Sequence, residues 1–379
     1  MTAPRDIGLY VHVPFCRQRC HFCAFYLEVA RPERIDAFCR ALAREIHLYR
    51  EADPLAGRNL ISIYFGGGTP TAMPALKLIA LLDLVRAAWP VGPSAEITVE
   101  AHPATVTRDD LHMLADASVT RVSFGAESMQ QDEFGKIGRP GTVRETEAAV
   151  ADAKAAGIAN INLDLMYGLP GQTVDSWAKT LDAARSLDPA HLSCYALTIE
   201  EGTRLAHDIG RDLVAAPDES QQVEMEAAAE EMLTAAGFRR YEISNYAKPG
   251  WECRHNLLYW TGQDYLGLGP SAQSYVNGVR FGDIADLTAY VECLRNGRLP
   301  VAERTELSPA QQQRDALVFG LRLIEGVPQE RVDTALATPQ SQAALAGLVA
   351  SGLMESEAGR LKLTRLGQRY ADTVAGDLF

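Results

Sequence analysis

Residues 12–25 read HVPFCRQRCHFCAF, a short stretch unusually rich in thiols. Its three cysteines fall within eight positions: Cys16, Cys20 and Cys23. Thiolates at this spacing bind soft metal centres, either tetrahedral zinc or an iron-sulfur cluster. Zinc would need a fourth ligand such as His12 or His21, whereas a 4Fe-4S cluster on three cysteines would leave one iron open to a small molecule. A chance meeting of cysteines in a loop is the third interpretation.

The cysteines follow the first of several short β-rich stretches that alternate with helical patterns. The stretches are 7–13, 61–67, 96–101, 121–127, 161–168 and 191–198. Apolar residues at helical spacing lie between them, as at Ile35, Phe38, Leu42 and Ile46. Strands alternating with helices predict an α/β fold with a parallel sheet and helices outside it. Six units are fewer than eight, so we expect a partial, TIM-like (β/α)6 barrel.

Residues that could bind a ligand lie at or near the ends of several of these strands. This is the edge of a parallel sheet at which active sites usually lie. They include a glycine turn and three acids: Gly66, Gly67, Gly68, Thr69, Glu100, Glu127 and Asp164. Glycines let a ligand approach the backbone, and free amides there can donate hydrogen bonds. Buried carboxylates at strand ends need a partner. A plain tight turn and solvated loop acids are the alternatives.

Composition limits the class of protein. The chain has 379 residues and a formal net charge of −13, so nucleic acid is not an expected partner. The N-terminus lacks the pattern of a secretory signal, and no apolar run has membrane-spanning length. The seven cysteines are an odd number with three bunched, unlike a secreted disulfide framework. We therefore expect a cytoplasmic protein with a metal cluster.

The motif CRQRCHFC, with YVHVPF before it and FGGGTP after it, resembles the radical S-adenosylmethionine (SAM) superfamily, and more closely its HemN and HemW branch. Similar stretches run along the chain: EAHP (100–103), GR (138–139), NLDLMYGLPGQT (162–173), LSCYALTIEEGT (192–203), YEISNYAKPG (241–250), HNLLYW (255–260) and YLGLGPSA (265–272). The resemblance implies a 4Fe-4S cluster on the three cysteines. SAM would chelate the fourth iron and be cleaved, on reduction, to a 5'-deoxyadenosyl radical.

The resemblance also implies the other site residues. The SAM-binding set is Gly66, Gly67, Gly68, Thr69, Glu100, Glu127, Arg139 and Asp164, with Arg139 facing the SAM carboxylate unless it lies on the surface. Candidates for binding heme or a substrate are Cys253, His255 and Tyr259, for which a purely structural role is the alternative. No residue is assigned a catalytic role.

The chain divides into three predicted parts. Residues 1–240 form the radical SAM partial barrel, residues 241–300 form a HemN/HemW-type extension that carries HNLLYW, and residues 301–379 form a winged-helix-like domain. A long helix is expected from about residue 218 to residue 236, and another over SPAQQQRDALVFGLRLIEGV in the last part.

Phe25 stands where the oxygen-independent coproporphyrinogen III dehydrogenase of this family has a fourth cysteine. This favours the HemW type, a heme chaperone that hands heme to acceptor hemoproteins, with flavodoxin or ferredoxin as electron donor. The chain departs from that type at Glu127, Gly141 and Gln273, where Gln, His and His are usual. Two enzyme alternatives therefore stay open: the dehydrogenase itself, and a methyltransferase that uses two SAM molecules on an aromatic or heterocyclic substrate.

Overall fold

Six parallel strands form the centre of the computed structural model, which describes residues 6–378. In spatial order they are β1 (Ile7–Val13), β4 (Leu60–Gly67), β5 (Val91–Ala101), β6 (Arg121–Glu127), β7 (Asn160–Tyr167) and β8 (His191–Ala196). Each strand pairs in parallel with the next one along the chain. The predicted partial (β/α)6 barrel is confirmed.

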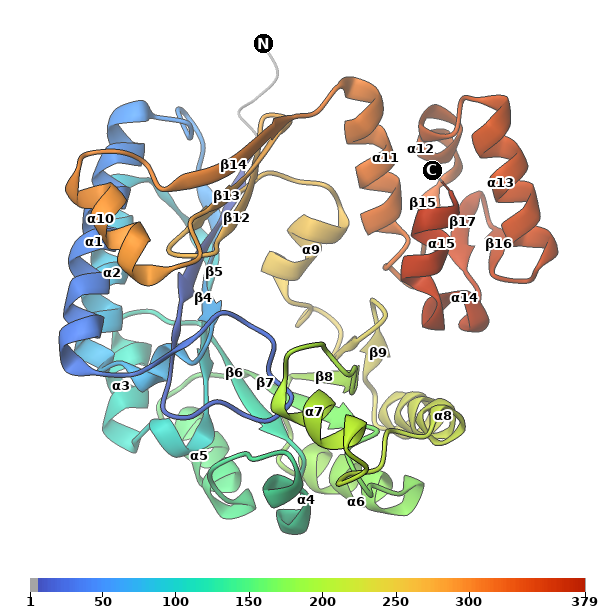
Figure 1. The fold of residues 1–379 in the computed structure, drawn as a ribbon, viewed down its shortest axis with the longest axis horizontal. Helices are drawn as coiled ribbons and strands as arrows, with labels where there is room; N and C mark the ends of the chain where they lie inside the picture. The colour runs from blue at the N-terminus through green and yellow to red at the C-terminus, as the bar shows by residue number, and fades with distance from the viewer. Residues whose placement is uncertain (1–5, 379) are drawn as a thin grey trace.

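Helices connect these strands and cover their outer face (Figure 1). The connecting helices are α1 (Pro32–Ala52), α2 (Ala75–Ala88), α3 (Arg108–Asp116), α4 (Gln131–Lys136), α5 (Val143–Ala155) and α6 (Val174–Ser186), and α7 (Arg204–Gly210) and α8 (Glu219–Ala235) follow β8. The predicted helix over 218–236 corresponds to α8, which Asp218 caps through a hydrogen bond from the amide of Gln221.

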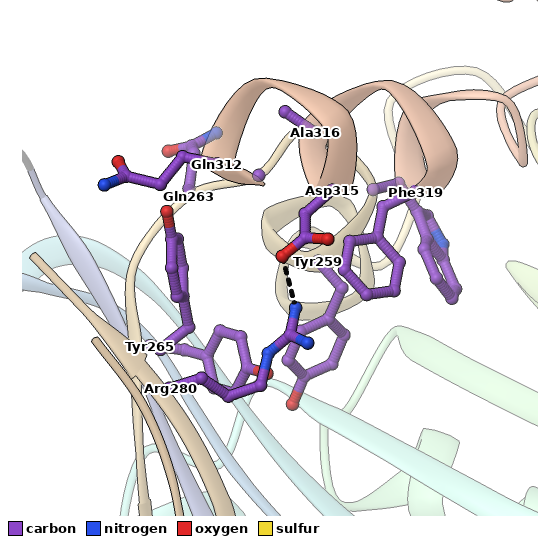
Figure 2. Close-up of a pocket in the computed structure, with 11 residues that line it drawn as sticks. Tyr259, Gln263, Tyr265, Arg280, Gln312, Asp315, Ala316 and Phe319 are labelled. Carbon is purple, nitrogen blue, oxygen red and sulfur yellow. Dashed lines mark hydrogen bonds and ion pairs between the residues drawn. The ribbon is translucent and has the colours of Figure 1, made fainter. Parts of the chain in front are cut away.

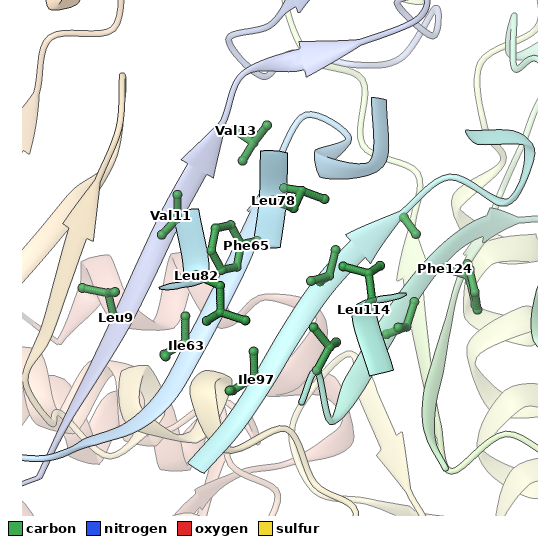
Figure 3. Close-up of a cluster of buried hydrophobic side chains, with 14 of the residues drawn as sticks. Leu9, Val11, Val13, Ile63, Phe65, Leu78, Leu82, Ile97, Leu114 and Phe124 are labelled. Atoms are coloured by element: carbon green, nitrogen blue, oxygen red, sulfur yellow. The ribbon is translucent and has the colours of Figure 1, made fainter. Parts of the chain in front are cut away.

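Alternate residues of each strand face opposite sides of the barrel wall. Outward residues are apolar and pack under the helices; Figure 3 shows Leu9, Val11, Val13, Ile63 and Phe65 beside Leu78 and Leu82 of α2. Inward residues are polar or small, as at Arg121, Ser123, Gly125 and Glu127 of β6. This period of two puts the hydrophobic core outside the barrel wall and leaves a polar interior.

The sheet extends beyond the barrel at both ends. On the β1 side it continues through β11 (Tyr265–Leu268), β12 (Gln273–Val276), β13 (Val279–Asp283) and β14 (Val301–Glu306), and on the β8 side through β10 (Asn245–Ala247) and β9 (Arg239–Arg240). The sequence patterns did not predict these strands. Helix α9 (Arg254–Trp260), which carries HNLLYW, lies between the two ends of the sheet (Figure 1), and α10 (Leu287–Arg295) packs on α1.

The C-terminal part, predicted to be winged-helix-like, consists of helices around a small three-stranded sheet. Its helices are α11 (Pro309–Gly320), α12 (Gln329–Ala335), α13 (Pro339–Ala350), α14 (Arg365–Arg369) and α15 (Ala371–Asp377), around a small sheet of β15 (Val327–Pro328), β17 (Arg360–Leu363) and β16 (Met354–Glu357). The predicted helix over SPAQQQRDALVFGLRLIEGV is too long. It ends at Gly320 because the next residues hydrogen bond back to residues 241–243, including a bridge between Leu323 and Glu242.

Two points remain, one on membrane-spanning helices and one on the predicted domain boundaries. Over residues 6–378, we find no helix with the length and apolar character that crossing a membrane requires. The three-part division at residues 240 and 300 stays a prediction.

Candidate functional site

One large cavity occupies the barrel interior, with a volume of about 850 Å³. Ten of the predicted site residues line it: Cys16, Cys20, Cys23, Gly67, Gly68, Thr69, Glu100, Glu127, Arg139 and Asp164. Gly66 is adjacent in β4 and contacts the Glu100 carboxyl group. Residues from five separate strand ends and loops thus meet at one place, as the carboxyl edge of a parallel sheet predicts.

The cysteines lie on a long loop that the rest of the chain holds in place. Short strands β2 (Phe15–Cys16) and β3 (Glu28–Val29) pair at the base of the loop. Its middle is bonded on two sides: the His21 amide donates to Ile137 O (2.9 Å), and the Leu205 amide donates to His21 O (2.8 Å). The loop is therefore ordered by contacts with the barrel rather than by the cysteines alone.

The three thiols are unpaired and half-buried. Burial raises the pKa of each one, that of Cys20 to about 11, although the nearby Arg139 charge opposes the shift at Cys16 and Cys20. Within residues 6–378, no three His, Cys, Asp or Glu side chains are arranged to hold a single metal ion. A 4Fe-4S cube differs because it offers each thiolate a separate iron, and binding would deprotonate the thiols.

The glycine turn presses against the cysteine loop. A Cβ on Gly68 would lie 2.7 Å from Phe15 O, and one on Gly67, where φ is +109°, would lie 2.7 Å from the His12 ring. The expectation of free amides here is wrong. The amides of Gly67, Gly68 and Thr69 already donate to Glu100, Val13 O and Phe15 O, because the turn is so closely packed. A ligand's amino group would therefore be met by carbonyl and carboxylate oxygens.

Two acids of the predicted SAM-binding set are held by short hydrogen-bond networks. Glu100 accepts from the Tyr64 hydroxyl (2.8 Å) and the Gly67 amide (3.1 Å). Burial raises the pKa of Glu100 to about 7, and the Asp164 charge adds to this effect. Asp164 accepts from Ser123 Oγ (3.0 Å) and Asn162 Nδ2 (2.9 Å). Both carboxyl groups keep an orientation toward the cavity in which a cationic ligand group would be stabilised.

Glu127 and Arg139 form an ion pair in the same wall, with Arg139 Nη1 3.2 Å from Glu127 Oε1. Glu127 has φ of +62° at a β-bulge, where the register between β6 and β7 shifts. Such a conformation is strained for a residue other than glycine and re-aims the side chain. Burial raises the pKa of Glu127 to about 7, while Arg139 opposes the shift. Arg139 also donates to Gly125 O.

The candidates for heme or substrate binding lie away from the cavity surface. Cys253 and His255 are fully buried. Both ring nitrogens of His255 are bonded, Nδ1 to Ser62 Oγ and Nε2 to the Tyr259 hydroxyl, each at 2.8 Å. Ligation of a heme iron by His255 would require one of these bonds to break, since the ligating nitrogen must give up its hydroxyl partner. From the same motif, Asn256 does line the cavity.

Tyr259 faces a second, smaller pocket of about 180 Å³ between α9, the β11–β13 strands and α11 (Figure 2). Its walls include Trp260, Tyr265 and Phe319, and an ion pair between Arg280 and Asp315 (2.9 Å) crosses one side. Five of its eleven lining residues are aromatic, and the pocket lies outside the barrel.

Comparisons with known proteins agree with this geometry. A model of the radical SAM superfamily matches residues 10–184. A protein named heme chaperone HemW from Mycobacterium tuberculosis is 35% identical, over 99% of this chain and 95% of that protein. The chain belongs to the HemN/HemW family of the radical SAM superfamily. A second protein named heme chaperone HemW, from Bacillus subtilis, is 31% identical over 97% of each chain.

The fold is shared with a solved structure. The structure of coproporphyrinogen III oxidase (HemN) from Escherichia coli matches 99% of this chain and 90% of that one with a TM-score of 0.86, at 22% identity. Membership of the superfamily implies a 4Fe-4S cluster and SAM as cofactors. The cavity fits both, since three thiols, carbonyl oxygens and acids face it together.

The sequence patterns missed several residues of the cavity wall. These are Tyr64, Arg121, Asn162, Ser193 and Asn256. A usable signal was present, because the first four alternate with apolar residues inside strands that are otherwise hydrophobic. A polar residue at every second position of a buried strand marks the face that lines a barrel interior.

Proposed function

We propose that the chain binds a 4Fe-4S cluster through Cys16, Cys20 and Cys23, binds SAM beside it, and acts as a heme chaperone-like protein that transfers heme to acceptor hemoproteins. The observation that carries this proposal is the similarity to two proteins named heme chaperone HemW over nearly the full length of the chain. A similarity limited to the barrel would support only the cofactors, whereas this one includes the extension and the C-terminal part.

Phe25 supports the same choice. It lines the mouth of the cavity and is 68% exposed, close to the three thiols in the loop. A phenyl ring cannot ligate iron, so this position adds no fourth ligand to the cysteines. It offers instead an apolar surface at the entrance of the cavity.

The roles proposed for the wall residues follow from their chemistry. Glu100 and the carbonyls of the glycine turn would hold the SAM amino group, and Asp164 would accept from its ribose hydroxyls. Arg139 would face the SAM carboxylate. When bound, the reduced cluster would supply the electron that cleaves SAM, delivered by a donor such as flavodoxin or ferredoxin. We also propose a cytoplasmic location, since the unpaired cysteines suit a reducing compartment.

Two measurements on the anaerobically reconstituted protein test the function. The first titrates the protein with heme and then adds an apo-hemoprotein; we expect stoichiometric binding followed by transfer. The second incubates the protein with SAM and dithionite and measures 5'-deoxyadenosine; we expect at most about one equivalent. Multiple-turnover SAM cleavage without heme binding would contradict the proposal and favour an enzyme.

A further inference from the structure

Arg121, the first residue of β6, is a buried cation without a direct partner. Its side chain is 2% exposed and faces the cavity at the opposite end of the barrel from the cysteines. Within residues 6–378, its Nε and Nη1 atoms have no hydrogen-bond partner, and no carboxylate forms an ion pair with it. Arginine stays charged in proteins, and a buried donor without an acceptor is unfavourable. The two unbonded nitrogens therefore call for an acceptor, and an anionic one suits the positive charge.

The neighbours of Arg121 stabilise its charge without bonding to it. Burial disfavours the charged guanidinium, but Cys253, Glu96 and two nearby tyrosines outweigh this effect and raise the pKa of Arg121. They leave its Nε and Nη1 atoms without an acceptor among the described residues. Glu96 is committed to α9, where Oε1 accepts from the His255 amide (3.3 Å). The charge of Arg121 also acts on His255. Burial lowers the pKa of His255, and the charge of Arg121 lowers it further.

Asn256 supplies a second unused donor in the same cavity. It is the second residue of HNLLYW and lines the cavity wall, and its side-chain amide makes no hydrogen bond within the described part of the chain. The neighbouring Asn162 is different, since its amide nitrogen already donates to Ser123, Asp164 and Ser193. A guanidinium and an amide left free in one cavity are the groups that bind a carboxylate.

This end of the cavity lies deeper in the barrel than the proposed SAM site and adjoins it at Glu100. Arg121 is in register with Thr98, two residues before Glu100 on β5, and its charge opposes the rise in the pKa of Glu100. Arg121 and Glu127 are six residues apart in β6, which corresponds to about 20 Å along an extended strand. The amino-acid part of SAM would lie beside the cysteines at the Glu127 end. An anion bound at Arg121 would therefore not be the carboxylate of SAM, and would belong to another group in the cavity.

We propose that Arg121 and Asn256 form a carboxylate-binding site at the inner end of the cavity, and that a propionate of the bound heme occupies it. The inference rests on the proposed heme-binding function. It gives Asn256 a role in ligand binding. His255 instead has a structural role, since it joins α9 to β4 through Ser62 and also bonds to Tyr259 within α9.

The test compares heme with its dimethyl ester, which keeps the porphyrin but lacks free carboxylates. We expect the wild-type protein to bind heme at least about tenfold more tightly than the ester, in line with the strength of hydrogen bonds to charged groups. Arg121→Gln should lose most of this preference while its affinity for the ester stays within about twofold. Asn256→Ala should lose part of it.

Arg240→Gln is the matched control, since Arg240 is also a buried arginine but is paired with Glu226 and does not line this cavity. It should keep the preference for heme. Equal binding of heme and ester by the wild type, or an unchanged preference in folded Arg121→Gln, would overturn the inference. If Arg121→Gln does not fold, an unchanged preference in Asn256→Ala overturns it. Loss of SAM binding in Arg121→Gln would also overturn it, by assigning the site to SAM.

Failure of the proposed function gives a different result. In that case neither heme nor its ester binds to the wild-type protein, whereas failure of the inference alone leaves heme binding intact without a preference for free carboxylates.

Discussion

Arg139 and Glu127 are paired in the cavity wall at 3.2 Å, so the arginine proposed to face the SAM carboxylate already has a carboxylate partner. Both side chains are nearly buried, at 6% and 14% exposed. A buried pair of this kind is stable only while each member keeps a partner. A ligand carboxylate must therefore share or replace Glu127 at Arg139.

Glu127→Gln should tighten SAM binding at pH 8 by about 3- to 10-fold, because glutamine no longer competes as an anion for Arg139. The gain should shrink at pH 6, since burial raises the pKa of Glu127 to about 7 and the wild-type side chain is then mostly neutral. Equilibrium dialysis with SAM at both pH values measures the effect. Asp132→Asn, an exposed acid on α4, is the control and should change nothing. Weaker SAM binding by Glu127→Gln at pH 8 would show that Glu127 itself holds SAM.

Replacing any one of Cys16, Cys20 and Cys23 by alanine should abolish cluster binding after anaerobic reconstitution. Each thiolate would occupy its own iron, and the wall offers no spare thiol because Cys194 and Cys253 are buried elsewhere. Iron and acid-labile sulfide analysis, with the visible absorption band, measures the loss. Cys39→Ala on α1 should retain the cluster in full. A cluster that persists in a single-cysteine variant would show that another residue is a ligand.

Much of this site could be predicted from sequence because its residues lie in local motifs. The strand that ends at Val13 leads straight into the cysteine loop, and the turn after β4 is marked by consecutive glycines. The meeting of Arg121 with Asn256 could not be predicted, for a different reason. They are 135 positions apart, and only the closure of the barrel by α9 brings them into one cavity. Likewise, no local pattern shows that the amides of the glycine turn are already bonded.

Glu100 should cause a loss of stability in the cofactor-free protein as the pH rises from about 4.5 to about 7. Burial raises the pKa of Glu100 to about 7, so in this window Glu100 binds a proton more readily in the folded state than in the unfolded state, and its contribution to the free energy of unfolding falls with pH. Glu100→Gln should remove this loss, so that between pH 5 and pH 8 the stability of the variant changes relative to that of the wild type by about +1–3 kcal/mol. Urea denaturation at both pH values measures the change.

Glu147→Gln is the control for this pH effect, since Glu147 is an exposed acid on α5 and should leave the slope as in the wild type. Saturating SAM should also reduce the slope, because a cation beside Glu100 favours its charged form. A slope in Glu100→Gln equal to that of the wild type would mean that Glu100 is charged at both pH values.

His255→Ala should destabilise the protein by about 2–4 kcal/mol without changing the absorption spectrum of bound ferric heme. The substitution leaves the Ser62 and Tyr259 hydroxyls without their shared partner in the barrel interior. Tyr259→Phe should cost about 1–2 kcal/mol in the wild type and clearly less in the His255→Ala background, since the two residues share one bond. Urea denaturation of the four proteins measures this coupling. A shifted heme band in folded His255→Ala would instead make His255 an axial ligand, which would require the imidazole to release one of its two hydroxyl partners when heme binds.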